Sequence, residues 1–273
     1  MSFSVNTNAG AFAALQNLNA TQGALNQTQS RINTGLKVAS AKDNAAIYSI
    51  AQSMKGDLAE LSAVKASLDR GKQIMDIAIA AGEAVSDTLI EMKEKAVAAS
   101  QEGLDTDTYN SLNDDFFALR AQIDSIVNNA EFDGVNLVTV GATDSSVLAG
   151  KDGATLTLPA DDMSAIHLQF GLPNIDLYNA TNAQATVTVI ENALDDVNQG
   201  LSQFGATSKR LDSLIEFNSK LSDTVETGVG NLVDADLAKE SANLQAFQTK
   251  QQLGLQALGI ANQAPQAVLS LFR

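Results

Sequence analysis

The chain has 273 residues, no cysteine, one histidine and a formal net charge of −15. Without cysteine it can hold no disulfide framework, thiolate metal site or cysteine nucleophile, and one histidine excludes a multi-histidine metal site. Such an acidic chain would repel a phosphate backbone, so nucleic acid is not an expected partner. No apolar run reaches the ~18 residues of a transmembrane helix, and the first residues lack the pattern of a secretory signal peptide. We expect neither membrane insertion nor a cleaved leader.

Charged residues are unevenly distributed. Residues 1–42 contain three basic residues and no acid, and residues 241–273 contain two basic residues and no acid. A helix that faces water normally carries charge on its outer face. The two uncharged ends therefore indicate surfaces that face other protein, unless they are disordered polar tails.

Apolar residues in both end segments recur at steps of three and four, from Asn8 to Leu36 and from Leu237 to Phe272. This heptad-like repeat predicts two amphipathic helices rather than permanently disordered tails. Pro265 should end or kink the second helix near the preceding residue.

The same steps run through the middle of the chain. A helix over about 45–100 would be roughly 80 Å long at 1.5 Å per residue. After a break at Gly103, Asp105 or Thr106 is expected to cap a second helix. A third helix is expected from about residue 182 to 227, where two glycines, Gly228 and Gly230, should interrupt it.

Between the second and third of these helices the period changes. Residues 132–180 contain a turn signal at Asp133-Gly134 and several other glycines and prolines. Short alternating or β-branched runs lie between them, and they predict a few small strands. The runs are Val135–Val140, Ala154–Leu158 and Ala165–Phe170.

The order of the elements predicts a mainly α fold. It would be an elongated rod of long coiled-coil-like helices, with paired N- and C-terminal helices and a small β-hairpin region at the turning point. We expect one domain from residues 1–42 plus 234–273, and a second, helical-bundle domain from residues 43–233 with a β insertion at about 132–180. The terminal pair has polar residues at its repeat positions and should be marginal alone, which indicates self-assembly.

Four stretches carry a resemblance to the bacterial flagellins. VNTNAGAFAALQNL (5–18) and SRINTGLKVASAKDNAA (30–46) resemble the N-terminal signature of that family. EFDGVNLV (131–138) is similar to its F-[ND]-G-x-x-L motif, and ANQAPQAVLSLFR (261–273) is similar to its C-terminal ending. Long motifs at opposite ends, in the right order, are far more specific than a heptad pattern.

The resemblance implies a structural subunit that self-polymerises into the extracellular flagellar filament for motility. It implies export through the flagellar type III pathway, which would explain the missing signal peptide. The implied partners are further copies of the chain, other flagellins, hook-associated junction and cap proteins, and a flagellar export chaperone. No cofactor is expected, and the large outer domains of many flagellins are not expected here.

Apolar residues of the end segments are the predicted subunit contacts. They are Leu15, Leu18, Leu25, Ile32, Leu36, Leu244, Phe247, Leu255, Leu258, Val268, Leu269 and Leu271.

The resemblance also locates a stretch that the vertebrate Toll-like receptor for flagellin binds in many family members. Its equivalent here contains Leu89, Glu91, Lys93, Glu94 and Lys95. Glu91 replaces an arginine and Lys95 a leucine, and a reversed charge in a contact adds repulsion. We therefore expect weak recognition by that receptor.

The remaining reactive side chains are interpreted as modification, surface or packing residues, with no catalytic role. Thr143, Ser145, Ser146 and Thr155 are candidate O-glycan acceptors. His167 is interpreted as a surface or packing residue. The adjacent acid pairs Asp114-Asp115, Asp161-Asp162 and Asp195-Asp196 are interpreted as solvated faces, because neighbouring helical residues diverge by ~100°.

The residues leave two alternative functions open. The first is a hook–filament junction protein of the same export family, which would share the helical ends, although the full C-terminal motif is not expected in it. The second is a secreted coiled-coil binding protein. An enzyme is disfavoured, because the β insertion has one histidine and no cluster of metal ligands.

Overall fold

The computed structural model describes residues 7–164 and 175–270, with side chains up to residue 263. The chain divides into two compact units, one formed by residues 1–57 with 224–273 and the other by residues 58–223. Helices dominate both, which confirms the predicted fold class. In chain order the elements are α1 (Ala9–Thr34), α2 (Ala45–Ala99), α3 (Thr106–Asn129), β1 (Glu131–Phe132), β2 (Val135–Asn136), β3 (Ser145–Leu148), β4 (Thr155–Leu158), α5 (Ala180–Val233) and α6 (Leu237–Ser270).

The 58–223 unit is built around the apolar stripe of α2, which packs with α3 and α5. Every repeat position of α2 from Leu61 to Ala99 is buried. The largest fully buried side chains of this unit come from these helices and the segments between them: Val64, Leu68, Met75, Leu89, Met92, Phe116, Leu137, Leu158, Leu177, Ile190, Phe204 and Leu211. The core is aliphatic, as the low aromatic content requires.

α3 begins where the sequence predicts. The Asp105 carboxylate accepts a hydrogen bond from the Thr108 N–H at 2.7 Å, as an N-cap. Farther along the helix, buried Asn113 accepts a hydrogen bond from the Leu177 N–H at 3.0 Å. This bond fixes the segment that leads into α5.

Two antiparallel hairpins lie between α3 and α5. β1 and β2 are joined by the predicted Asp133-Gly134 turn, in which both residues have positive φ. β3 pairs with β4 from Ser145↔Leu158 to Leu148↔Thr155. β4 falls within the predicted run 154–158, whereas β3 was not predicted, and the run Ala165–Phe170 and His167 lie outside the described residues.

The β3–β4 hairpin packs directly onto α2. A Cβ atom built on Gly71 would lie 2.9 Å from Cγ1 of Val147, so glycine permits this close approach. The Leu148 N–H donates to Oγ of Ser67 at 2.8 Å. The hairpin is therefore held by one apolar and one polar contact to the same face of α2.

The helix ends predicted at Gly228–Gly230 and at Pro265 were wrong, while a kink at Pro265 stays a prediction. α5 continues through Gly228 and Gly230 to Val233, and Met54 Cε lies 2.8 Å from the position of a Cβ on Gly228. That glycine serves close helix packing instead of a break. α6 continues through Pro265 to Ser270. Proline leaves the Ala261 carbonyl without a helical donor, and the Asn8 side chain donates a hydrogen bond to it instead.

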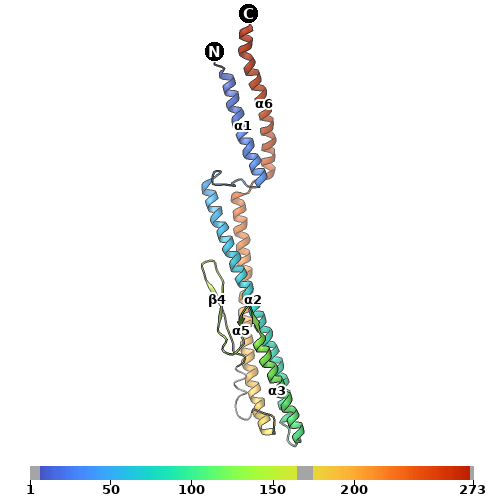
Figure 1. The fold of residues 1–273 in the computed structure, drawn as a ribbon. Helices are drawn as coiled ribbons and strands as arrows, with labels where there is room; N and C mark the ends of the chain where they lie inside the picture. The colour runs from blue at the N-terminus through green and yellow to red at the C-terminus, as the bar shows by residue number, and fades with distance from the viewer. Residues whose placement is uncertain (1–6, 165–174, 271–273) are drawn as a thin grey trace. The chain divides into compact units, whose positions relative to one another are not determined.

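In the other unit α1 and α6 lie side by side and antiparallel (Figure 1). Gly35 ends α1 in the left-handed conformation, with φ of 71°. Beyond it, the N–H groups of Lys37 and Val38 both donate to the Val233 carbonyl, and the Ala235 N–H donates to the Gly35 carbonyl. These bonds join the segment that follows α1 to the segment between α5 and α6, at one end of the terminal helix pair.

Candidate functional site

The terminal helix pair buries little and exposes much apolar surface. In α1 only Leu25 and Thr28 are buried. Phe12 is 65% exposed, and Ile260 on α6 is 70% exposed. Further large apolar side chains on these two helices are also exposed: Leu15, Leu237, Leu253 and Leu255. Apolar groups of this size in contact with water favour association with other protein.

The structure divides the predicted subunit-contact residues into three groups. Leu25 packs inside the helix pair, and Leu15 and Leu255 are exposed. Six are half-buried: Leu18, Ile32, Leu36, Leu244, Phe247 and Leu258. The side chains of Val268 and Leu269, and all of Leu271, lie outside what the structure describes.

Polar contacts join α1 and α6 inside this pair. Arg31 is the only charged residue of α1 and Glu240 is the only acid of α6. They form an ion pair at 3.1 Å, with Glu240 buried. The Gln251 side-chain amide donates to the Gln22 side chain. Composition alone did not predict these pairings, because the partners are more than 200 positions apart.

A shallow groove runs along the same pair. It is lined by Asn17, Ala20, Thr21, Ala24, Phe247 and Lys250. The Lys250 ammonium lies 5.6 Å from the centre of the Phe247 ring, in cation–π geometry. A groove with no acidic side chain and one lysine in its lining, beside exposed apolar side chains, can receive a helix of similar composition.

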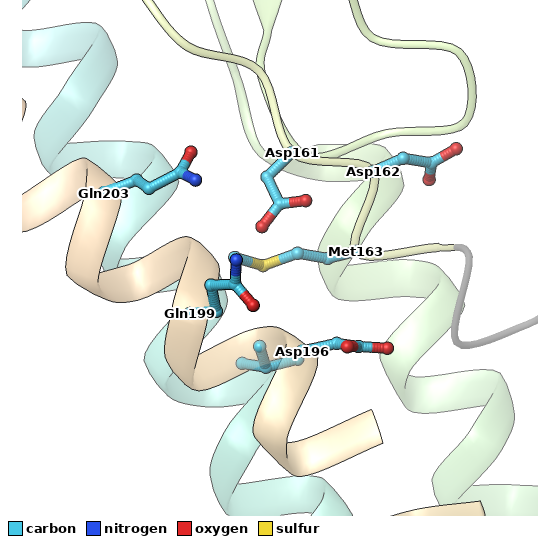
Figure 2. A pocket seen from close by; sticks show the side chains of 7 residues that line it. Asp161, Asp162, Met163, Asp196, Gln199 and Gln203 are labelled. Atoms are coloured by element: carbon cyan, nitrogen blue, oxygen red, sulfur yellow. The ribbon is translucent and has the colours of Figure 1, made fainter. Parts of the chain in front are cut away.

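The 58–223 unit contains a polar pocket of about 230 Å³ between α5 and the segment after β4. Figure 2 shows the Asp161 carboxylate pointing toward α5 and the Asp162 carboxylate pointing away. Burial and the negative charges of Asp196 and Asp162 raise the pKa of Asp161 above its ordinary value. The structure thus brings together acids from two pairs that were interpreted as separate solvated faces.

This pocket does not have the donor set of a metal or catalytic site. Both oxygens of Asp162 accept bonds from the chain itself, from Gly141 and Ser164. Within residues 7–164 and 175–270, no group of three or more His, Cys, Asp or Glu side chains could hold a metal ion.

The receptor-equivalent stretch lies on α2 in the 58–223 unit. Leu89 is fully buried in the core, so its side chain is not available to a partner. Lys93 forms an ion pair with Glu191 at 2.9 Å, and Lys95 forms one with Asp115 at 2.8 Å. The hydrogen bond and charge of Asp115 raise the pKa of Lys95. Glu91 and Glu94 are exposed, and the expected weak recognition stays a prediction.

The candidate glycan acceptors lie in and beside the β3–β4 hairpin. Thr143 precedes β3 and is exposed, and Ser146 and Thr155 are exposed strand residues. Ser145 is half-buried at the start of β3. Modification of these residues stays a prediction.

Comparison with known proteins places the chain in a family. Residues 5–141 match the bacterial flagellin N-terminal helical region, and residues 187–272 match the bacterial flagellin C-terminal helical region. Flagellin FljK of Caulobacter vibrioides is 48% identical over 271 residues, which cover 99% of this chain and 98% of that protein.

Solved structures agree on the fold. A Bacillus cereus flagellin aligns with a TM-score of 0.51 at 22% identity, covering 56% of this chain and 88% of that one. A putative flagellar hook-associated protein from Vibrio parahaemolyticus aligns with a TM-score of 0.58 at 14% identity, covering 70% of this chain and 100% of that one. At these identities the likeness establishes the fold alone.

Paired terminal helices with exposed apolar side chains define a self-assembling helical subunit. The chain belongs to the bacterial flagellin family, the structural subunits of the extracellular flagellar filament. No helix in the part of the chain that the structure describes is long and apolar enough to cross a membrane.

Proposed function

We propose that the chain polymerises through its terminal helix pair, as the predicted domain of residues 1–42 and 234–273, while residues 43–233 form the surrounding helical domain. The observation that carries this is the surface of α1 and α6. It exposes Phe12, Leu15 and Ile260, and it has almost no charge to repel another copy. Burying these side chains between subunits would gain about 25 cal/mol per Å² of apolar area.

The marginal stability of the pair also supports passage through a narrow export channel. With one large apolar side chain of α1 buried, the pair gains little hydrophobic energy before assembly. We infer that the chain travels unfolded through the flagellar type III pathway, accompanied by an export chaperone. In this proposal the filament also contacts other flagellins, and hook-associated junction and cap proteins adjoin its two ends.

No catalytic role belongs to this proposal. The acidic pocket is the strongest candidate for one, but its Asp162 carboxylate accepts hydrogen bonds from the backbone N–H groups of Gly141, which precedes β3, and of Ser164. The rest of its lining is two more carboxylates, Asp161 and Asp196, with amide and apolar side chains. These lining residues include no hydroxyl, imidazole or amine that could act as a nucleophile or orient a general base.

The test places a carboxylate in the helix pair. Leu18 is half-buried against Gly254 on α6, so Leu18→Asp should place an unpaired charge inside the helix pair and cost about 2–5 kcal/mol in each subunit. Leu258→Asp should act in the same way. We expect seeded filaments, measured by sedimentation and electron microscopy, to disappear in both variants.

The matched control is Asn19→Asp, which adds the same charge at the exposed neighbouring position. It should leave assembly close to normal. Wild-type filament growth from Leu18→Asp and Leu258→Asp would show that these faces do not contact other subunits.

A further inference from the structure

Pro265 leaves one backbone carbonyl of α6 without its helical hydrogen-bond donor. The helix spans Leu237–Ser270, so this proline lies inside it. Proline has no N–H, and the group that would accept from residue 265 is the carbonyl of Ala261, four residues earlier. Ala261 is half-buried, so its carbonyl is partly shielded from water and a donor from elsewhere would stabilise it.

The structure shows that partner on the other terminal helix. Nδ2 of Asn8 donates to the Ala261 carbonyl at 2.7 Å. Oδ1 of the same side chain accepts from the Ala11 N–H at 3.0 Å and caps the N-terminus of α1. One amide therefore completes the hydrogen bonding of two helices whose sequences lie at opposite ends of the chain.

Two further polar contacts obey the same register. Along α1 the partners are Asn8, Gln22 and Arg31, and along α6 they run backward as Ala261, Gln251 and Glu240. The steps are 14 and 9 residues along α1 and 10 and 11 residues along α6, so the total spans of 23 and 21 residues agree with a single antiparallel alignment. A slip of one heptad would displace the helices by about 10 Å and break all three contacts.

Apolar packing alone selects this alignment weakly. α1 is mostly small and amide side chains, and Leu25 is its one buried large apolar residue. The helix repeats similar residues every seven positions, so slipped alignments would bury similar apolar area. The polar contacts, which have few substitutes elsewhere on the two helices, distinguish one register from the next.

We propose that Asn8 is a positioning residue for assembly: its side-chain amide replaces the missing Pro265 N–H, and this contact locks α1 and α6 in the register that polymerises. The proposal rests on the proposed function. The register matters because it sets the level of Phe12 and Leu15 on α1 against Leu255 and Ile260 on α6, all of which are exposed. A slipped pair would present these side chains to the next subunit at the wrong levels.

The decisive variants separate the two roles of Asn8, which caps α1 and donates to the Ala261 carbonyl on α6. Aspartate and serine cap helices about as well as asparagine, but neither carries the NH₂ donor. Asn8→Asp and Asn8→Ser should each lower filament mass by roughly three- to tenfold, the effect expected for losing a part-buried hydrogen bond. Pro265→Ala restores a backbone N–H to α6, so it should make the Asn8 amide redundant.

The double variants test that redundancy. Asn8→Asp with Pro265→Ala should assemble like Pro265→Ala alone. An undiminished effect of the Asn8 change in the Pro265→Ala background would overturn the proposal, as would normal filaments from both single Asn8 variants. Asn19→Asp is the control for added charge, and an equal loss there would also overturn it.

Register can be read directly because the chain has no cysteine. Leu18→Cys with Gly254→Cys reports the observed alignment, and Leu25→Cys with Gly254→Cys reports a slip of one heptad. Disulfide formation should move from the first pair toward the second in Asn8→Asp and return in the double variant. An unchanged first pair in Asn8→Asp would show that the residue does not set register.

Failure of the proposed function is distinguishable. If the unmodified chain forms no filaments on seeding, polymerisation through this pair is refuted. The disulfide pairs still report the alignment in the soluble chain, because oxidation traps a marginal helix pair in the register in which it forms. In the soluble chain, loss of the Leu18→Cys with Gly254→Cys disulfide in Asn8→Asp supports the proposal, and an unchanged yield of that disulfide refutes it.

Discussion

Adding one methyl group at Gly71 should weaken the protein, although the same change elsewhere should strengthen it. In Gly71→Ala the new Cβ would lie 2.9 and 3.1 Å from the two γ carbons of Val147, whereas carbon atoms pack best at about 3.5–4.0 Å. Val147 is buried and cannot swing away, because its neighbour Leu148 is bonded to Ser67 on α2. The hairpin must therefore shift.

The magnitude follows from two opposing effects. Overpacking of this kind costs about 1–3 kcal/mol, and alanine in a helix interior gains about 1 kcal/mol over glycine. Gly71→Ala should thus lower the free energy of unfolding by about 0–2 kcal/mol. Gly205 on α5 has nothing within 4 Å of a built Cβ, so Gly205→Ala should raise it by about 0.5–1 kcal/mol.

Chemical denaturation followed by circular dichroism measures both variants on the same unit of the chain. A destabilised Gly71→Ala should also show faster hydrogen exchange at the Leu148 amide, and Val147→Ala in that background should recover part of the loss. If Gly71→Ala proves as stabilising as Gly205→Ala, the hairpin does not press on α2 and the reasoning fails.

Three other outcomes are expected. Deletion of residues 1–30 or 255–273 should abolish filaments, yet leave a cooperative thermal transition from the long-helix core, and normal filament growth would contradict this. The monomer should stimulate the Toll-like receptor poorly in a reporter-cell dose–response. Glu91→Arg with Lys95→Leu should gain at least about tenfold in potency, since one charge-assisted contact is worth about 2 kcal/mol or more, and no gain would place the receptor contact elsewhere. Asp161→Asn should stabilise the 58–223 unit at neutral pH only: the raised pKa means that the folded carboxylate carries a cost above that pKa, which is relieved as pH falls through it. A stability gain that persists well below the ordinary value of 3.8 would show another cause.

Periodicity predicted the parts of the fold that depend on a single helix. The α2 stripe from Leu61 to Ala99 is buried at every predicted position, because a helix packed along its length repeats the same environment every three or four residues. The Asp105 cap was predictable for a similar reason, since its acceptor and donor lie within one turn.

Periodicity did not predict the contacts between segments that are far apart in the sequence. Pro265 and Gly228 carry strong local signals for helix ends, but Asn8 compensates the proline from 253 positions away and Met54 packs against the glycine. The Asp161–Asp196 pocket likewise depends on how the segment after β4 lies on α5. The predicted contact residues of the terminal helices were recognisable as a set, but which of them face outward depends on the register of the pair.

The backbone link between the terminal helices and the rest of their unit bears on how a subunit would carry torque. Lys37 and Val38 donate to one carbonyl, that of Val233, and Ala235 donates back to Gly35. Rotating one connection about its own axis would first have to break these bonds, each with a net worth of about 1 kcal/mol. Together the three bonds oppose independent rotation of the two segments. A twist applied to either terminal helix would therefore be passed in part to the other segment through these bonds.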